Sequence, residues 1–456
     1  MSYNAVVARI HTRPLLGADK LVIGDVLGYS VIVGIDTPQD ALGIFFEAGG
    51  QLSDEFCKAN NLYRIKDADG KDIGGMFEDN RRVKCIKLRG AKSEGFWIPI
   101  QSLAFTGHDL CGLKEGDSFD MFGDVPICRK YETPAQRAKG VSNAAVKVRK
   151  ANICFPKHYD TAQFKRVGKD IPVGSIIYTS LKVHGTSQRT GVVLDEVLRT
   201  DGMYGLANRF FQLNWLYAIA PFRWGRKQVV SLQAKAPKFT HRVYAKLNGT
   251  RNTVIEKRTT PGFYGEEEGF RLTCAAQISP HKGEVFFYEI VGFTESGASI
   301  MASHDTGVLK SKEFTKKYGQ TMVYKYGCLP KECKVFVYRI IMVNEDGKII
   351  EYSWPQVVSR CKELGLTVVP EACPPFVYDG DFDALQKKIN ALVEGESGNE
   401  ILMTDAIDHT TLLEGVVVRY EHESGFGWLK NKSYAFLAME LGAREDNKFF
   451  DREEIS

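Results

Sequence analysis

The chain has 456 residues, enough for two or three domains that each bury their own core, so a small disulfide-stapled scaffold is excluded. Its composition, 44% hydrophobic and 25% charged, excludes collagen-like, coiled-coil and disordered proteins. The net charge of +4 is too small to indicate a nucleic-acid partner by itself.

The sequence shows no membrane or export signal. The longest uncharged stretch near the middle of the chain, residues 210–222, has 13 residues, fewer than the roughly 18 needed to span a bilayer. The first residues lack a basic segment followed by an apolar run. The ten cysteines are scattered singly, without the spacing of a zinc or redox motif. We therefore expect a cytoplasmic protein with reduced thiols and no membrane partner.

Residues 1–125 are predicted to form a small β-barrel. Short apolar β segments recur about every ten residues and are separated by Gly, Pro and Asp clusters, which is typical of a closed or partly closed barrel rather than βαβ units. The segments are residues 4–10, 19–28, 29–35, 42–49, 81–90 and 95–100.

Residues 126–152 are predicted to be a linker, because they are polar and basic with little apolar periodicity. Between residues 129 and 170, eleven Lys and Arg face only three acidic residues. Such a run is typical of a solvated linker and, less often, of a strip that contacts phosphates. The sequence leaves both interpretations open.

Residues 153–456 are predicted to form a mixed α+β domain whose sheets are mostly antiparallel. Helices are expected at 354–364 and 383–394. They alternate with β runs at 175–183, 190–197, 242–250, 283–293, 334–343 and 412–420.

Lys182 is the first candidate for chemistry. It ends an apolar β run, directly before a glycine-containing turn and a second β run, so its side chain is expected to point into the space between sheets. An amine is nucleophilic only when neutral, so a reactive lysine needs a pKa lowered by burial or by nearby cations. Alone, the pattern Lys-x-His-Gly-Thr is weak, and an exposed turn is the more common reading.

Four further charged residues fit the same chemistry. Glu289 and Glu414 lie within or beside hydrophobic β runs, and buried carboxylates of this kind need a cation or a metal as partner. Lys430 and Lys432 are two residues apart, hence on one face of a strand. Together with Lys182 they predict a site for a metal-bound polyphosphate, although each segment alone is equally compatible with an edge strand carrying exposed charge.

These residues occur in a family-like order. The segments KVHGTS, FYEIVG, KVFVYRI, EGVVV and LKNKS resemble the nucleotidyl-transferase motifs of ATP-dependent RNA ligases, within the covalent nucleotidyl-transferase superfamily. The resemblance extends over residues 153–437. The segments ADKL, EFCKANNLYR, RRVKCIKLRG and SEGFWIPI resemble the N-terminal OB domain of Deinococcus-type RNA ligases. The resemblance implies an OB-like barrel over 1–125 followed by a nucleotidyl-transferase (ATP-grasp-like ligase) domain over 153–456.

The resemblance also implies roles for individual residues. Lys182 would attack the α-phosphorus of ATP and hold AMP as a phosphoramidate. Glu289 and Glu414 would contact the ribose or water-bound Mg²⁺ or Mn²⁺. Lys430 and Lys432 would stabilise charge on the α-phosphate, which is catalysis by positioning and electrostatics.

Other positions also match residues of the family. Tyr338 would stack on adenine and Val417 would close the opposite face, although Tyr338 without this context reads as a core strand residue. Ser187 resembles a small polar residue near phosphate. Arg251 resembles the arginine that grips the phosphate end, with Arg258 as a competing candidate.

Two features depart from the simple pattern. His184 stands two residues after Lys182 where most of the superfamily has Asp, which puts metal contact from that position in doubt. Lys246 begins a second Lys-x-polar-Gly-Thr match, AKLNGT, but the fuller motif favours Lys182 as the nucleophile. The insertion at 208–240, in which basic residues are interleaved with aromatics, fits either nucleic-acid binding or packing of an extra helix.

The resemblance implies a monomeric RNA ligase of RNA repair that seals 3′-OH and 5′-phosphate ends, with an RNA-containing nicked duplex as partner. A DNA ligase or a capping enzyme is an alternative. It is disfavoured because the 24 residues after Lys432 leave no room for the C-terminal OB domain of those enzymes. A non-catalytic scaffold that binds nucleic acid through an OB domain is the alternative from another class.

Overall fold

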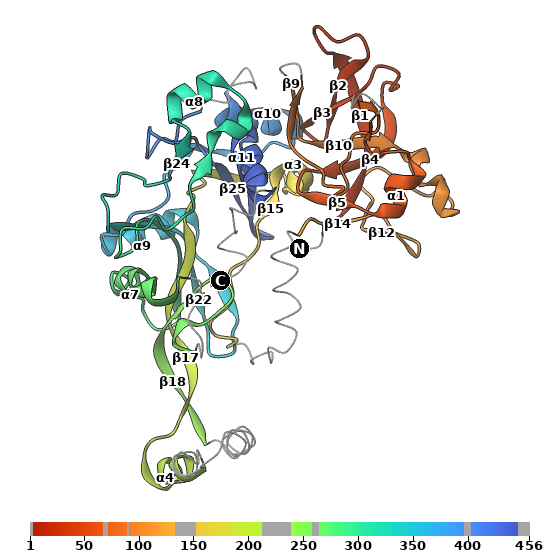
Figure 1. Cartoon of the computed structure of the whole chain (residues 1–456). Helices are drawn as coiled ribbons and strands as arrows, with labels where there is room; N and C mark the ends of the chain where they lie inside the picture. Colours follow the sequence, from red (N-terminus) through yellow and green to blue (C-terminus); the bar gives the residue numbers. More distant parts are fainter. Residues whose placement is uncertain are drawn as a thin grey trace, which may run out of the picture.

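The computed structural model describes residues 3–66, 72–88, 91–132, 152–211, 239–257, 264–395 and 403–445. A barrel-like N-terminal sheet lies beside a larger part built of two sheets and their helices (Figure 1). The predicted fold class, α+β with antiparallel sheets, is confirmed.

The N-terminal sheet runs in the order β10-β4-β1-β2-β3, with β11 also paired to β1. Its two end strands meet, because the Glu94 N–H donates to the Ser30 carbonyl at 2.8 Å. The sheet therefore curls into a nearly closed barrel around Ile10, Tyr29 and Phe45. The strands are β1 (Ala5–Pro14), β2 (Leu21–Val26), β3 (Tyr29–Gly34), β4 (Ala41–Glu47), β10 (Gly95–Pro99) and β11 (Ser118–Phe119).

Short elements surround this barrel. A helix, α1 (Asp54–Ala59), begins where the Ser53 side chain accepts a hydrogen bond from the Phe56 N–H, a standard N-cap. The others are β5 (Gly50–Leu52), β6 (Ile65–Lys66), β7 (Asp72–Gly74), β8 (Ile86–Leu88), β9 (Ala91–Ser93), η1 (Ile100–Thr106), β12 (Met121–Phe122), β13 (Val125–Pro126) and β14 (Cys128–Lys130).

The first sheet of the larger part runs β15-β26-β25-β16-β24, and all its pairs except β15–β26 are antiparallel. The helix α10 (Phe382–Glu394) packs Leu385 and Ile389 on Val416 and Leu429 of this sheet. The strands are β15 (Ala162–Gln163), β16 (Ile176–Leu181), β24 (Glu371–Val377), β25 (Gly415–His422) and β26 (Gly425–Lys432).

The second sheet runs β18-β17-β19-β22-β23 and is antiparallel throughout. Every residue of its central strand, β19, is buried, so the predicted hydrophobic run at 283–293 is a core strand. β17 and β18 extend away from the body to the helix α4 (Gly202–Phe211) (Figure 1). The strands are β17 (Thr186–Leu198), β18 (Thr240–Gly249), β19 (Glu284–Gly292), β22 (Cys333–Val343) and β23 (Ile349–Glu351).

The two helices expected from sequence are present as α9 (Trp354–Glu363) and α10. The start of α9 follows from its sequence, since the Ser353 N–H donates to the Gln356 side chain at 2.8 Å and Pro355 fits the first turn. The remaining elements are α3 (Phe164–Val167), η2 (Gly168–Asp170), η3 (Ile255–Lys257), η4 (Gly265–Glu268), α7 (Gly269–Ala276), β20 (His304–Asp305), η5 (Thr306–Leu309), α8 (Lys312–Tyr318), β21 (Thr321–Met322) and α11 (Tyr434–Glu445).

The stretch predicted as a linker starts later than expected. Cys128 to Lys130 form β14 and pair with β5, so the barrel part continues past residue 126. Residues 133–151 lie outside the described residues, as do Arg258 and most of the insertion, residues 212–238. The pairing of β14 with β5 forms backbone hydrogen bonds that the polar composition of this stretch did not indicate.

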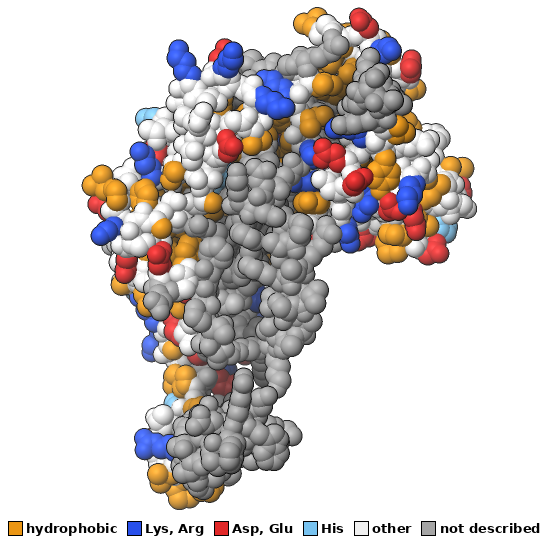
Figure 2. Space-filling model, viewed as in Figure 1, with side chains coloured by type: hydrophobic (Ala, Val, Ile, Leu, Met, Phe, Trp, Pro, Cys, Tyr) orange, Lys and Arg blue, Asp and Glu red, His pale blue; other side chains and the backbone are white. Residues whose placement is uncertain are grey.

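The expectations about thiols and charge can be compared with the structure. All ten cysteines are free. On the face drawn in Figure 2, Lys and Arg side chains are interspersed with Asp and Glu over both parts of the molecule, in keeping with the small net charge. No helix among the described residues is long and apolar enough to cross a bilayer.

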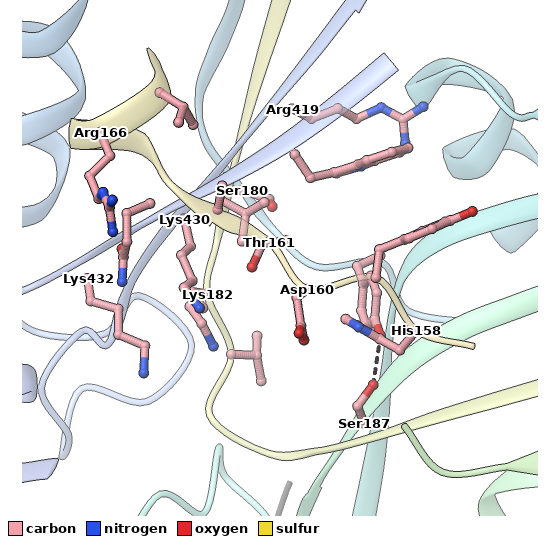
Figure 3. Close-up of a pocket in the computed structure, with 18 of the residues that line it drawn as sticks. His158, Asp160, Thr161, Arg166, Ser180, Lys182, Ser187, Arg419, Lys430 and Lys432 are labelled. Carbon is pink, nitrogen blue, oxygen red and sulfur yellow. Dashed lines mark hydrogen bonds between the residues drawn. The ribbon is translucent and has the colours of Figure 1, made fainter. Parts of the chain in front are cut away.

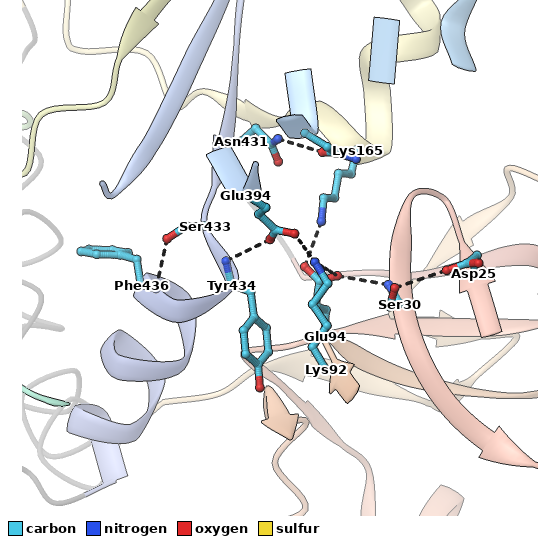
Figure 4. A network of polar contacts seen from close by, with 11 residues as sticks. Asp25, Ser30, Lys92, Glu94, Lys165, Glu394, Asn431, Ser433, Tyr434 and Phe436 are labelled. Carbon is cyan, nitrogen blue, oxygen red and sulfur yellow. Dashed lines mark hydrogen bonds and ion pairs between the residues drawn. The ribbon is translucent and has the colours of Figure 1, made fainter. Parts of the chain in front are cut away.

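A buried polar network joins the barrel to the larger part (Figure 4). Lys165 of α3 contacts Glu94 of the barrel at 2.9 Å, and their side chains are 7% and 1% exposed. Lys92 of the barrel pairs with Glu394 at the end of α10. Arg82 donates to the Leu441 carbonyl of α11 at 2.7 Å. These contacts fix how the two parts meet, which matters because the main cavity lies between them.

Candidate active site

Lys182 lies where the chain leaves one sheet for the other. It directly follows β16 of the first sheet, and β17 of the second sheet begins four residues later. Its N–H donates to the Gly415 carbonyl at 2.8 Å, which holds the loop on β25. The prediction that Lys182 points into the space between sheets is confirmed, since it lines the cavity there (Figure 3).

Glu414 is the carboxylate partner of Lys182. Its Oε1 lies 2.8 Å from the Lys182 amino nitrogen and 3.3 Å from that of Lys432. The side chain is 1% exposed, and burial alone would raise its pKa. The two lysines, together with His184, outweigh burial and hold the pKa of Glu414 well below its usual range. Glu414 is therefore a permanent anion beneath the amine.

Lys430 and Lys432 project from one face of β26 toward Lys182 (Figure 3). Burial, followed by repulsion from Lys432 and Lys182, lowers the pKa of Lys430 to about 8. Burial would also lower the pKa of Lys432, but Glu440 at 3.0 Å and Glu414 raise it instead. The cavity thus holds more positive than negative charge around Lys430, which suits a phosphate.

Glu289 lines the same cavity from the middle of β19, opposite Ser187 of β17. The loop that carries Lys182 passes very close to this strand at Gly185. A Cβ added at Gly185 would lie 2.5 Å from the Ile290 carbonyl and 2.7 Å from the Glu289 Cγ. Only glycine permits this approach, and so it brings Lys182 and Glu289 into one cavity.

Tyr338 and Ser187 form one wall of the cavity. The hydroxyls of the two residues are hydrogen bonded at 2.8 Å. The edge of the His158 ring lies against Tyr338, with ring centroids 5.7 Å apart. Val417 of β25 also lines the cavity. An aromatic and an aliphatic side chain in the same cavity provide the surfaces that a flat base needs.

Arg251 reaches the cavity from the loop after β18 and forms an ion pair with Asp160. Its competitor Arg258 lies outside the described residues. Arg251 is therefore placed with the other predicted site residues, and the pairing with Asp160 aims its guanidinium.

The cavity has a volume of about 720 Å³ and belongs to both parts of the molecule. Tyr3, Glu47 and Lys130 line it from the barrel side. Burial raises the pKa of Glu47, against the opposing effect of Arg166, whose guanidinium is 3.9 Å away. Sequence reasoning missed Tyr3 and Glu47, and it noted Lys130 and Arg166 only as members of a basic run. Segments that are distant in the sequence meet at this cavity, and a local sequence pattern cannot predict such a contact.

Lys246, the second motif match, is placed elsewhere. It lies within β18, and its amino group donates to the Ala275 and Ile278 carbonyls at 2.9 and 2.7 Å. Ala275 lies in the last turn of α7 and Ile278 lies just after the helix, where a cation is stabilising. Lys246 does not line the cavity described above, so its role is to hold a helix end.

A divalent metal would find limited protein ligands here. Within the described ranges, no three His, Cys, Asp or Glu side chains lie close enough to hold an ion. Glu414 faces the two lysines, whereas Glu289 faces the cavity. This arrangement fits Mg²⁺ or Mn²⁺ that arrives with a polyphosphate and keeps phosphate and water ligands, with Glu289 as the available carboxylate.

Comparisons with known proteins agree with this architecture. A variant of Naegleria gruberi RNA ligase with ATP and Mn matches with a TM-score of 0.51 at 12% identity, over 96% of this chain and 98% of that chain. The same ligase with PPi gives 0.51 at 14% identity, over 95% and 97%. A variant with AMP and Mn gives 0.51 at 13% identity, over 95% and 97%. No family model and no curated protein matches the chain. The chain thus has the fold of an RNA ligase.

Proposed function

We propose that this protein is an ATP-dependent RNA ligase that seals 3′-OH and 5′-phosphate ends through a lysyl-AMP intermediate and a 5′-adenylylated strand. The observation that carries the proposal is the convergence of Lys182, Lys430 and Lys432 on one cavity that Tyr338 and Ser187 also line. A nucleophile, a cationic phosphate site and a base-sized surface are then in reach of one nucleotide.

In the first step the neutral amine of Lys182 attacks the α-phosphorus of ATP. The new P–N bond forms as the bond to the bridging oxygen of pyrophosphate breaks, pyrophosphate leaves, and the nitrogen releases one proton to water to give the phosphoramidate. Lys430, and Lys432 beside it, stabilise the charge that develops on the α-phosphate oxygens. A bound Mg²⁺ or Mn²⁺ would neutralise triphosphate charge, with Glu289 as its protein carboxylate. In later steps AMP passes to the 5′-phosphate and leaves when a 3′-OH attacks.

Two features support nucleic-acid binding by the N-terminal part. Its strand order, β3-β2-β1-β4-β10 with contact between the end strands, fits a five-stranded OB barrel. Its residues Tyr3, Glu47 and Lys130 reach the cavity. We assign this part to holding a nicked duplex with an RNA 3′-OH strand, and the larger part to both nucleotide steps. The same proposal makes the enzyme a cytoplasmic monomer of RNA repair.

The decisive experiment is intact mass spectrometry after incubation with ATP or GTP and Mg²⁺, preceded by pyrophosphate treatment to remove bound AMP. A gain of one AMP from ATP alone is expected, followed by sealing of nicked RNA. A GMP adduct would indicate a capping-type enzyme instead, and the absence of any adduct would favour a scaffold that only binds nucleic acid.

We expect the adenylylation rate at low ATP to fall as pH rises through about 8. Lys430 with a pKa of about 8 is charged below that pH and neutral above it, so the phosphate site loses a positive charge at higher pH. Lys430→Arg should move this alkaline limb upward, because a guanidinium stays charged. The check is the pH profile of adenylylation under subsaturating ATP. An unchanged alkaline limb in Lys430→Arg would assign it to another group.

Replacing Tyr338 by leucine is expected to raise the half-saturating ATP concentration about 5- to 150-fold, as loss of a stacking ring costs about 1–3 kcal/mol. Tyr338→Phe is the matched control, because it keeps the ring and loses only the hydrogen bond to Ser187. The measurement is adenylylation rate against ATP concentration. Equal effects of both substitutions would mean that the hydroxyl, not the ring, matters.

A further inference from the structure

Two buried histidines lie end to end beside the nucleophile loop. His184 follows Lys182 by two residues, and His304 opens β20 on a distant segment. Their Nε2 atoms are 3.2 Å apart, a hydrogen-bond distance, and the residues are 6% and 0% exposed. Two imidazole nitrogens form a hydrogen bond only when one of them carries a hydrogen and the other offers a lone pair.

The other ring nitrogen of His184 faces the partner of Lys182. His184 Nδ1 lies 3.3 Å from Glu414 Oε2, while Glu414 Oε1 lies 2.8 Å from the Lys182 amino nitrogen. A continuous chain of contacts therefore runs from His304 through His184 and Glu414 to the nucleophile. His304 does not line the cavity and would touch neither nucleotide nor metal there.

Packing prevents the rings from turning to other partners. The His184 ring centroid lies 4.8 Å from that of Tyr324 and 5.0 Å from that of Phe436. The His184 backbone N–H donates to the Tyr326 hydroxyl at 2.7 Å. With the ring fixed, only the position of its hydrogen remains to be decided.

Either ring can supply the hydrogen of this contact, because donor and acceptor depend on the tautomer. Burial lowers the pKa of His304 to about 3, so His304 is neutral and its Nε2 carries either a hydrogen or a lone pair. In both cases one hydrogen joins the two Nε2 atoms, and Nδ1 of His184 stays on the side of Glu414.

We propose that His304 is a positioning residue that hydrogen bonds through Nε2 to His184 Nε2, fixes the His184 ring, and thereby holds Glu414 against Lys182. This proposal rests on the proposed function, in which Lys182 attacks ATP. It gives His184, the residue that replaces the usual Asp of the superfamily, a structural partner. An amine displaced from its line of attack reacts more slowly even when ATP still binds.

The test compares three variants. His304→Leu should lower the rate of Lys182 adenylylation at saturating ATP about tenfold, with the half-saturating ATP concentration unchanged, because one hydrogen bond is lost. His304→Gln, whose amide can donate from a similar place, should restore the rate to within about threefold of the wild type. Tyr324→Phe keeps the ring packing and removes a hydroxyl that has no partner within the described residues, so its rate should not change.

A stability control and a second readout complete the design. Phe314→Leu shortens a buried side chain of the same core, away from the histidines, and controls for loss of stability. Nitrogen NMR of ¹⁵N-histidine-labelled protein, with His184 assigned through His184→Gln, should show a hydrogen-bonded Nε2 of His184 in the wild type and the loss of that hydrogen bond in His304→Leu.

The outcomes separate the two proposals. If the wild type forms no AMP adduct, the proposed function fails, and the NMR comparison still decides the role of His304. If the wild type adenylylates and His304→Leu matches it, or if the Nε2 signal of His184 is the same in both, the positioning role is overturned. An equal loss in His304→Leu and Phe314→Leu would overturn it as well.

Discussion

Lys182→Ala is expected to form no enzyme–AMP adduct, a loss of about 10⁴-fold or more in the adenylylation rate, because it removes the amine that forms the phosphoramidate bond. Lys182→Arg should be equally inactive, since a guanidinium keeps the charge beside Glu414 but does not become a neutral amine. Intact mass after incubation with ATP and Mg²⁺ measures both.

The chain supplies its own control for this experiment. Lys246→Ala removes the lysine of the second motif match, whose amino group holds the end of α7 outside the cavity. It should lower stability modestly and leave the adduct intact. An adduct that survives in Lys182→Ala and is lost in Lys246→Ala would reverse the assignment. Retention in Lys182→Arg and loss in Lys182→Ala would point to a charge role for Lys182.

Lys165→Met is expected to lower the free energy of unfolding by about 3–5 kcal/mol, because it leaves the Glu94 carboxylate buried without its closest cation. The pair is 2.9 Å apart with almost no solvent exposure, and the other basic neighbour of Glu94, Lys92, is 3.9 Å away. Glu94→Gln combined with Lys165→Met should be less destabilising than Lys165→Met alone, since the buried charge is then gone. Urea unfolding at pH 7 measures all three proteins.

The loss should also depend on pH. Burial raises the pKa of Glu94, but Lys165 and Lys92 outweigh it, so the pKa is lowered in the folded state. The stabilisation by ionised Glu94 is therefore complete above the unfolded pKa of about 4.3 and disappears as pH falls through the folded pKa. The difference between wild type and Glu94→Gln should shrink in the same range.

An exposed ion pair serves as the matched control. Lys58 and Asp54 are 2.6 Å apart on α1, with 70% and 46% of their side chains exposed. Lys58→Met should leave the unfolding midpoint unchanged, because solvent screens such pairs. If Lys165→Met behaves like Lys58→Met, the network between the two parts of the molecule does not contribute to stability.

Local sequence determined much of the molecule. The hydrophobic run around Glu289 predicted a strand, and β19 is buried along its whole length. Two-residue spacing predicted that Lys430 and Lys432 share a face of a strand, as they do in β26. The helices expected at 354–364 and 383–394 agree with α9 and α10 to within one residue at each end. Such features depend on neighbours in the chain, so a single sequence contains them.

Only the tertiary structure decided which distant groups share a site. Three contacts join segments more than 100 residues apart: the pairing of Lys182 with Glu414, the approach of Arg166 to Glu47, and the contact of His304 with His184. The tertiary structure also separated Lys182 from Lys246, which lie in two similar motifs. Lys182 faces the cavity, whereas Lys246 holds a helix end. The sequence determined which residues could be reactive, because residue type and strand period are local properties. Burial and charge around each residue depend on long-range packing, and so the fold alone decided which of them share one environment.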